Sequence, residues 1–362
     1  MRRAVATARA KSRSSRAPVK ARQRGGFEQM LGTYRDLTTQ ALLNKIPQNG
    51  PPYLYDLVSA YPRRSGKGLR AALCFATCAA LRGSHRQALN SAVAIELLHN
   101  AFLIHDDVQD GSELRRGEPT LYQEHGIPIA VNVGNATNLL ALRRLMENRA
   151  TLGPEVSWRI VQETERMMTH SLEGQAIELA WIRGNICDLG VRDYMQMCLK
   201  KTSWYSFIYP MRVGAVIARP GRLEKDEFCR LGWYFGAAFQ IQDDILNLTG
   251  DYERYGKEIG GDLWEGKRTL MLIHVLKQCR PQERVRLRRF LALPRENRSA
   301  SEVKWVYELM LRNKSIDYAR RAARQLAGAA LLEGLAAFRG LPDTEEKRFI
   351  LEMILYVVNR DR

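Results

Sequence analysis

The sequence contains no hydrophobic run long enough to cross a membrane. A membrane-spanning helix needs about 18 or more consecutive apolar residues, and no uncharged apolar stretch of that length occurs. The best candidate, residues 88–105, is interrupted by Asn90, Glu96, His99 and Asn100. The N-terminus also lacks the apolar segment of a secretory signal. We therefore expect no transmembrane segment.

Cysteine pairs and strand patterns are also missing. The six cysteines form no CxxC pair and have no histidine at a spacing suited to zinc. We expect buried or free thiols in a reducing compartment, which indicates a cytoplasmic protein. No convincing alternating strand run and no repeat of fixed period occurs, which argues against β and repeat architectures. The cysteines are Cys74, Cys78, Cys187, Cys198, Cys229 and Cys279.

Acidic residues are absent from the first 26 positions. Residues 1–26 carry nine Lys or Arg, against a net charge of +17 for the 362-residue chain. This segment is rich in Ala, Ser and Arg and has no periodic apolar face, so we predict a disordered basic tail. Two other interpretations stay open: an organelle transit peptide, which is Arg- and Ser-rich and acid-poor, or a segment that binds nucleic acid or anionic lipid.

Helix signals dominate the rest of the chain. Four long apolar segments have helical character: residues 69–83, 86–110, 156–181 and 224–250. Turn signals rich in Pro, Gly and Asn separate the helices. We predict an all-α fold of roughly ten or more helices in one domain over residues 27–362, with a central helix surrounded by the others.

Two of these helices end in acidic clusters. Asp106 and Asp110 are spaced i, i+4 and share one helix face, so they could hold one hard cation. Asp107 lies about 100° away, turned toward solvent or a second ion. Oxygen-only ligands select Mg²⁺, Mn²⁺ or Ca²⁺. The first cluster alone could equally be a solvated helix end.

The second cluster strengthens the metal interpretation. Asp243 and Asp244 end another apolar helix, with Asn247 at i+4 of the first. If the two helices pack together, the clusters face each other. Because Mg²⁺ prefers one or two carboxylates plus phosphate oxygens, this pair suggests a polyphosphate that bridges several Mg²⁺ ions. Seven basic residues could contact it, although each alone reads as a surface charge: Lys67, Arg70, Arg115, Arg116, Lys201, Lys257 and Lys267.

Ten short motifs occur in a fixed order along the chain. Together they resemble the trans-isoprenyl diphosphate synthase (polyprenyl synthetase) family, most closely geranylgeranyl diphosphate synthases, over about residues 28–362. Two positions depart from the common pattern, because Asn247 and Asn135 stand where an aspartate is frequent. The motifs are GKxxR (66–70), His99 seven residues before the first aspartate, DDxxD (106–110), RRG (115–117), GQ (174–175), KTxxYSF (201–207), FQxxDD (239–244), GK (256–257), GDxxxGKxTL (261–270) and VVNRDR (357–362).

The resemblance implies an isoprenoid synthase catalytic domain over residues 27–362. It implies Mg²⁺-dependent head-to-tail prenyl transfer from an allylic diphosphate to isopentenyl diphosphate, by a homodimer that needs no nucleic acid. About three Mg²⁺ ions, which Mn²⁺ can replace, would be bound. The implied metal ligands are Asp106, Asp107, Asp110, Asp243, Asp244 and Asn247.

The resemblance also divides the remaining polar residues between two substrates. Arg115, Lys201 and Lys257 would contact the allylic diphosphate, and Lys267 is a further substrate-binding residue. Thr202 and Gln240 would offer oxygens to the allylic cation, so that Lys201, Thr202 and Gln240 form the catalytic set. Isopentenyl diphosphate would bind without metal on Lys67, Arg70, His99 and Arg116. A lone histidine on an apolar helix is usually structural, but His99 lies two turns from Asp106, on the same face.

Product length is expected to depend on the helix that precedes Asp106. Ala101 and Phe102 lie one turn below the metal site, and Leu98 lies one turn deeper. A bulky side chain at these positions would block the growing product chain and act as the floor of the product tunnel. Ala101 is too small to block it, whereas Phe102 can block it further down. We therefore expect geranylgeranyl diphosphate (C20) as product, with farnesyl diphosphate (C15) as the alternative. A class I terpene cyclase, a non-catalytic modulating subunit and a nucleic-acid binder are the other hypotheses.

Overall fold

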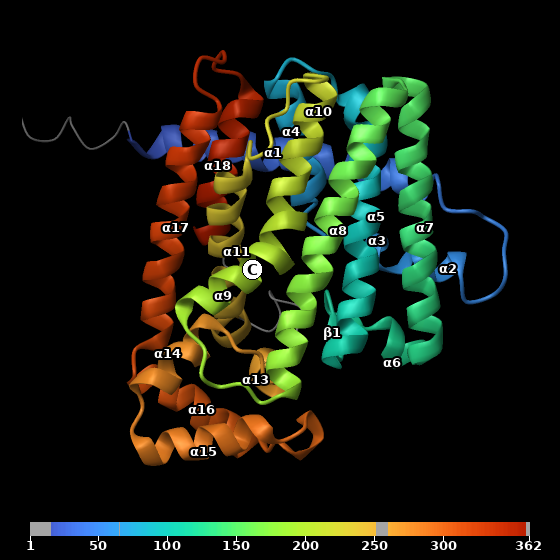
Figure 1. The fold of residues 1–362 in the computed structure, drawn as a ribbon. Helices are drawn as coiled ribbons and strands as arrows, with labels where there is room; N and C mark the ends of the chain where they lie inside the picture. Colours follow the sequence, from blue (N-terminus) through green and yellow to red (C-terminus); the bar gives the residue numbers. More distant parts are fainter. Residues whose placement is uncertain (1–15, 65, 251–259, 360–362) are drawn as a thin grey trace, which may run out of the picture.

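The computed structural model describes residues 16–64, 66–250 and 260–359, with side chains from Gly25 onward (Figure 1). Within these ranges the chain is helical, apart from connecting turns and one two-residue antiparallel hairpin. The predicted all-α class is confirmed. The first half contains α1 (Arg16–Leu43), α2 (Tyr55–Val58), α3 (Ala60–Arg63), α4 (Leu69–Ala80), α5 (His85–Asp110), β1 (Leu114–Arg115), β2 (Glu118–Pro119), α6 (Leu121–His125), α7 (Ile127–Leu152) and α8 (Pro154–Arg183).

The second half begins with a bent helical segment and ends in a long antiparallel pair. It contains α9 (Val191–Cys198), the π-helix η1 (Leu199–Ile208), α10 (Tyr209–Ala218), α11 (Cys229–Thr249), α13 (Gly261–Glu265), α14 (Leu270–Gln278), α15 (Pro281–Ala292), the 3₁₀ turn η2 (Arg295–Asn297), α16 (Ala300–Arg312), α17 (Ser315–Ala337) and α18 (Glu345–Asn359). In Figure 1, α14, α15 and α16 form a layer at one end of the bundle.

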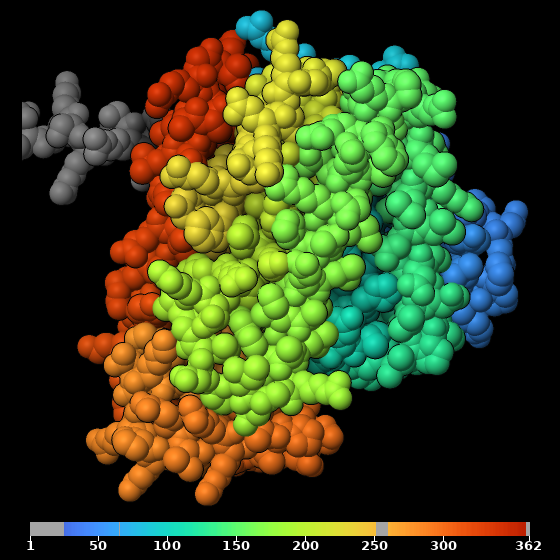
Figure 2. Space-filling view, viewed as in Figure 1, coloured from blue at the N-terminus to red at the C-terminus, as the bar shows by residue number. Residues whose placement is uncertain are grey.

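Helix α5 lies inside the bundle. It starts with a capping box, in which the Ser84 side chain accepts from the Gln87 backbone N–H and Gln87 accepts from the Ser84 N–H. It ends at Gly111, whose φ of 66° is the left-handed conformation that glycine adopts without strain. Residues on several faces of α5 are buried, and Figure 2 shows the helix at this surface only between α7 and α8.

The core consists of two clusters of buried apolar residues. The larger joins α1, α4, α5, α7, α10 and α18. The smaller joins α9, the second half of α11, the layer of α14, α15 and α16, and the first half of α17. Helix α11 contributes to both clusters. The two helices that end in acidic residues, α5 and α11, are therefore fixed by packing along their length, and their polar ends project from this core.

The π-helix η1 is wedged between α8 and α11. A π-helix is rare and often marks a functional site. Two glycines give it room: a Cβ at Gly174 of α8 would overlap the backbone N of Lys201, and a Cβ at Gly236 of α11 would lie 2.5 Å from the Cα of Ser203. Both helices therefore contact the η1 backbone directly, which fixes the residues that η1 carries.

Two further features bear on the expectations from the sequence. Helix α1 begins at Arg16, so the prediction of a disordered tail does not hold for residues 16–26, and residues 1–15 lie outside the described residues. No described helix is both long enough and apolar enough to span a membrane. All six cysteines are free, and four of them are buried.

We expect Gly174→Ala to lower the free energy of unfolding by about 1–3 kcal/mol, because the added methyl group must displace the η1 backbone. Gly328 is the matched control: it lies in α17, and nothing lies within 4 Å of the position that an added methyl group would take there. Gly328→Ala should leave stability unchanged or raise it by up to about 1 kcal/mol. Urea denaturation measures both. Equal effects of the two substitutions would show that η1 is not tightly packed.

Candidate active site

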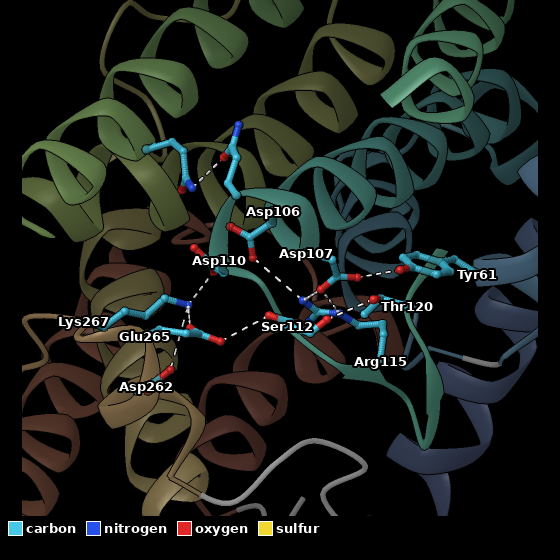
Figure 3. Close-up of polar contacts among 12 residues, drawn as sticks. Tyr61, Asp106, Asp107, Asp110, Ser112, Arg115, Thr120, Asp262, Glu265 and Lys267 are labelled. Carbon is cyan, nitrogen blue, oxygen red and sulfur yellow. Dashed lines mark hydrogen bonds and ion pairs between the residues drawn. The ribbon is translucent and has the colours of Figure 1, made fainter. Parts of the chain in front are cut away.

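Four segments bring polar side chains together near the end of the bundle. These are the C-terminal ends of α5 and α11, the π-helix η1, and the segment from α13 to Lys267. They are linked in a ring: Lys201 of η1 contacts Asp106 of α5, Thr202 contacts Gln240 of α11, and Lys267 contacts Asp110. Asn247 of α11 closes the ring by accepting the Asp262 N–H at 3.0 Å. Figure 3 shows the α5 side of this ring.

Asp107 faces away from the other two aspartates of its motif. Its carboxylate accepts a hydrogen bond of 2.5 Å from the Tyr61 hydroxyl and one of 2.9 Å from Arg115 Nε (Figure 3). Asp107 is 1% exposed and Arg115 is 5% exposed. Burying such a charge pair carries a large desolvation cost, which its close geometry and the Tyr61 hydrogen bond offset, and removing one partner is strongly destabilising.

This geometry corrects one expectation. The helical spacing predicts that Asp107 faces solvent or a second ion, but it is buried against Arg115 and Tyr61. The implied contact of Arg115 with the allylic diphosphate stays a prediction: its guanidinium pairs with Asp107, lies 3.9 Å from Asp106 and lines the cleft beside Asp110. The pair instead anchors the β1 strand to the end of α5. The spacing could not reveal this, because the partner Tyr61 is 46 residues away.

Asp110 lies in a group of acids arranged around one ammonium. Lys267 Nζ lies 2.6 Å from Asp110, 2.7 Å from Glu265 and 3.9 Å from Asp262. Burial, followed by the nearby Asp106 carboxylate, raises the pKa of Asp110 to about 7, against the lowering effect of Lys267. Lys267 thus offsets part of the repulsion between three carboxylates. These residues line an open cleft of about 360 Å³ together with Arg115 and Asn247.

In the second acidic cluster, as in the first, one aspartate is buried and the other is partly exposed. Asp244 is 5% exposed and accepts from the Gln240 amide and from the Tyr194 hydroxyl, each at 2.8 Å. Burial raises the pKa of Asp244 to about 7. Asn247 is also 5% exposed, and its amide oxygen accepts from the Asp262 N–H. Asp243 remains partly exposed. Protein donors contact both oxygens of Asp244 and the amide oxygen of Asn247, and the metal-ligand role of these two residues stays a prediction.

The π-helix places Lys201 and Thr202 between the two clusters. Lys201 forms ion pairs with Glu178 of α8 and, at 3.5 Å, with Asp106. Burial lowers the pKa of the Lys201 ammonium, but Asp106 and Glu178 outweigh it, so the net shift is upward. Lys201 is therefore a permanent cation beside Asp106. The Thr202 hydroxyl donates to Gln240 Oε1 at 2.6 Å.

A second, mainly basic group lies about two helical turns before the acidic end of α5, around His99. Arg70 contacts His99 Nε2 at 3.1 Å and donates to the Tyr205 hydroxyl of η1 at 2.6 Å. Its guanidinium lies over the Tyr205 ring, 4.4 Å from the centroid. The buried Nε of Arg70 has no hydrogen-bond partner among the described residues. Lys67 Nζ lies 6.0 Å from the Tyr356 ring centroid of α18.

Arg116 completes this basic group from the hairpin. It donates to the Tyr61 carbonyl at 2.7 Å, and a Cβ at Gly66 would lie 2.5 Å from its guanidinium. Its φ of 56° is in the left-handed region, which costs a non-glycine residue energy. Arg116 and Gly66 line a cleft of about 340 Å³ that also includes Glu96. The hairpin thus directs two consecutive arginines to different partners: Arg115 contacts Asp107, and Arg116 contacts the Tyr61 carbonyl beside Gly66.

The donor set fits Mg²⁺ that is shared with a substrate. Asp106, Asp110 and Asp243 offer carboxylate oxygens, which Mg²⁺ prefers; Asp106 and Asp243 are partly exposed, whereas the Asp110 carboxylate is buried against Lys267 at the cleft. No group of three or more acidic, His or Cys side chains among the described residues is closed enough to hold a metal by itself. An open site of this kind needs further oxygens, and diphosphate supplies them.

Several residues of this arrangement were missed in the sequence. Asp262 and Glu265 lie within the identified GDxxxGKxTL motif and Glu178 lies four residues after Gly174 of the GQ motif, so their acidic character was a usable signal although no role was assigned to them. Tyr61 and Tyr194 could not be recognised as site residues, because a tyrosine in an apolar segment is usually part of the core.

The predicted Lys257 lies outside the described residues. Leu98 and Ala101 are fully buried on α5, and Phe102 packs edge-on against Tyr205, with 5.5 Å between ring centroids.

Comparison with known proteins identifies the class. The sequence profile described as "Polyprenyl synthetase" matches residues 51–310. The chain belongs to the polyprenyl synthetase family, and it is an isoprenyl diphosphate synthase. This agrees with the ordered motifs and with the two polar groups that lie along α5.

Individual relatives extend the similarity over most of the chain. The geranylgeranyl pyrophosphate synthase of Geoglobus acetivorans is 28% identical over 325 residues, covering 90% of this chain and 96% of the relative. The short chain isoprenyl diphosphate synthase of Methanocaldococcus jannaschii is 31% identical over 258 residues, covering 70% and 75%. The crystal structure of geranylgeranyl pyrophosphate synthetase from Pyrococcus horikoshii superposes with a TM-score of 0.80 at 28% identity, covering 92% of this chain and 99% of that one.

We expect Asp107→Asn to lower the free energy of unfolding by about 3 kcal/mol, because it leaves the buried Arg115 charge without its partner. Asp106→Asn, one residue earlier, is the control. The Asp106 side chain is 26% exposed, and its ion pairs with Lys201 and Arg115 are longer than the Asp107 contacts and are opposed by repulsion from Asp110, so the change should stay within about 0.5 kcal/mol. Chemical denaturation of the two purified variants provides the comparison. A smaller loss in Asp107→Asn than in Asp106→Asn would contradict the anchoring role.

Proposed function

We propose that this enzyme condenses isopentenyl diphosphate with an allylic diphosphate in the presence of Mg²⁺, with geranylgeranyl diphosphate (C20) as product. The observation that carries the proposal is the division of charge along α5. At its C-terminal end, carboxylates are interleaved with Lys201 and Lys267, which suits a metal-bound diphosphate. About two turns earlier lie Arg70 and His99, with Arg116 nearby on the hairpin, which suits a diphosphate without metal. Two anion sites are what a two-substrate condensation requires.

Asp106, Asp110 and Asp243 are the proposed metal ligands. Bound Mg²⁺ would act as a Lewis acid that stabilises the departing diphosphate. Lys201 and Lys267 stand among these carboxylates, so they are positioned to bind diphosphate oxygens that enter between them. Asp107 keeps the α5 end fixed through Arg115 while the other side chains rearrange.

Thr202 and Gln240 are placed to favour the allylic cation. Their oxygens meet at 2.6 Å, and the Thr202 proton points to Gln240. The lone pairs of Thr202 are therefore directed away from Gln240, and fixed dipoles of this kind stabilise charge that develops in the transition state. Neither group attacks the cation, since the double bond of isopentenyl diphosphate is the nucleophile.

The basic group around Arg70, His99 and Arg116 would hold isopentenyl diphosphate. Arg70 is fixed by His99 and the Tyr205 hydroxyl, while its buried Nε still has a proton to donate. Arg116 can approach the Gly66 loop because residue 66 has no Cβ. Lys67 lies on that loop between two glycines. The two guanidinium groups of Arg70 and Arg116 and the ammonium of Lys67 match the two phosphates of this substrate.

The C20 product is supported by the relatives and by α5. Similar proteins are named geranylgeranyl diphosphate synthases, including those of Geoglobus acetivorans and Sulfolobus acidocaldarius. Another, from Natronomonas pharaonis, is named geranylfarnesyl diphosphate synthase. A small residue at 101 and an aromatic residue at 102, held against Tyr205, are consistent with a floor that lies beyond a C15 chain.

We also propose a homodimer. Helix α7 carries exposed apolar side chains along one side: Val131 (37%), Leu139 (50%), Leu142 (46%) and Met146 (71%). At spacings of 8, 3 and 4 residues they form one stripe on the helix surface. A continuous apolar stripe of this kind is typical of a buried contact between protein chains.

The central test is product formation from isopentenyl diphosphate and each allylic primer, separated by chromatography. We expect a C20 product that requires Mg²⁺ and disappears on chelation. Asp106→Ala should lower kcat by about 100-fold or more, because it removes stabilisation of the leaving group. Glu173→Gln, which changes an acid paired with Lys200 on the surface of α8, should not. A hydrocarbon formed from geranylgeranyl diphosphate alone would instead indicate a cyclase.

Product length tests the role of the α5 side chains. We expect Ala101→Phe to shorten the product toward C15, because the larger side chain closes the tunnel one turn below Asp106. Phe102→Ala should lengthen it beyond C20 by removing the deeper floor. The product distribution is read at equal conversion for both variants. An unchanged distribution in both would mean that these residues do not line the tunnel.

A further inference from the structure

Tyr194 makes a buried contact with the second acidic cluster. It lies on α9, is 0% exposed, and its hydroxyl donates to Asp244 Oδ2 at 2.8 Å. Helix α9 continues directly into the π-helix that carries Lys201 and Thr202. Tyr194 therefore links the base of η1 to the end of α11 without reaching a substrate. A buried tyrosine needs a partner for its hydroxyl, and here the partner is a carboxylate.

The contact continues as a chain of hydrogen bonds to the reaction site. Gln240 Nε2 donates to Asp244 Oδ1 at 2.8 Å, and the Thr202 hydroxyl donates to Gln240 Oε1 at 2.6 Å. An amide can turn over and exchange its donor and acceptor ends, and the network decides which way it points. Both Asp244 oxygens accept in the structure, Oδ1 from Gln240 and Oδ2 from the Tyr194 hydroxyl. Asp244 therefore fixes the NH₂ end of Gln240 toward itself and the oxygen toward Thr202.

We propose that Asp244 and Tyr194 are positioning residues that set the direction of the Thr202 hydroxyl, and that Asp244 is not a metal ligand. The inference rests on the proposed role of Thr202 and Gln240 at the allylic cation. With the chain in this direction, Thr202 gives its proton to Gln240 and presents its lone pairs to the substrate side. If Gln240 turned over, Thr202 would accept from the amide and present its proton, which repels a cation.

The environment of Asp244 separates it from its neighbour. Both of its oxygens have protein donors and it is 5% exposed. Asp243 is partly exposed at the end of the same helix. The first cluster shows the same division, since Asp107 accepts from Tyr61 and is 1% exposed, whereas Asp106 is 26% exposed at its side chain. In each pair, the buried aspartate accepts from a tyrosine on another helix.

The decisive experiment exchanges the amide and the carboxylate. Asp244→Asn lets the Gln240 amide point either way, and we expect kcat to fall by about 10- to 100-fold with little change in either substrate KM. The double variant Gln240→Glu, Asp244→Asn reverses the two groups. The amide now at position 244 donates to the carboxylate at position 240 and accepts from Tyr194, while Thr202 still donates to position 240. The direction of the chain is restored, so we expect kcat to recover about tenfold over Asp244→Asn.

Ligand binding supplies a readout apart from turnover. Mg²⁺ with inorganic diphosphate should raise the melting temperature of Asp244→Asn as much as that of the wild type, because binding stabilises the folded state in proportion to affinity. Asp243→Asn should lose most of that rise. If Asp244 were a ligand, Asp244→Asn would lose the rise as well, and the double variant would stay as inactive as the single one. Either result overturns the proposal.

Tyr194→Phe tests the far end of the chain. We expect a fall in kcat of about tenfold at unchanged KM, because Asp244 loses one of its two donors. Tyr209→Phe is the matched control, since Tyr209 is equally buried and its hydroxyl contacts Thr164, away from the site. Equal kcat values for the two variants would overturn the role of Tyr194. A wild-type enzyme that forms no prenyl product would refute the proposed function instead, so the two failures are distinguishable.

Discussion

Repulsion between carboxylates at the ends of α5 and α11 is the constraint on which the rest of the site depends. Each helix brings an aspartate pair to the same region, and α13 adds Asp262 and Glu265. Without compensation, like charges this close would oppose folding. Lys201 and Lys267 lie between the acids and hold them in place. Under the proposed function the same ammonium groups would bind the diphosphate, so that stabilisation of the fold and recognition of substrate would use the same residues.

The two aspartate pairs follow one architectural pattern. In each pair one aspartate is partly exposed at the site and the other is buried against a tyrosine from a different helix. Asp107 ties α5 to α3 and the hairpin, and Asp244 ties α11 to α9. The buried members explain why the exposed ones are held so firmly. A helix end with four free carbonyls would fray if it were not fixed in this way.

Much of this arrangement could be predicted from the sequence. Apolar periodicity predicted the helix that became α5 (His85–Asp110) to within a residue, and the i, i+4 spacing correctly placed Asp106 and Asp110 on the side of the site. The inward turn of Asp107 could not be predicted, because it depends on Tyr61 and on the hairpin, whose distances from α5 are set by tertiary packing. The occupation of Arg115 has the same cause. The helical start at Arg16 was missed because a strongly basic segment without an apolar stripe gives no amphipathic signal.

The left-handed backbone at Arg116 has a consequence for how the protein can change. Glycine would occupy this φ of 56° without penalty, whereas arginine pays about 1 kcal/mol or more to remain there. A mutation to glycine would therefore relax the hairpin while it removes a cation from the cleft beside Gly66. Selection for thermal stability and selection for substrate binding act in opposite directions at this position. Heat tolerance must then be gained elsewhere in the bundle, at sites whose backbone is already relaxed.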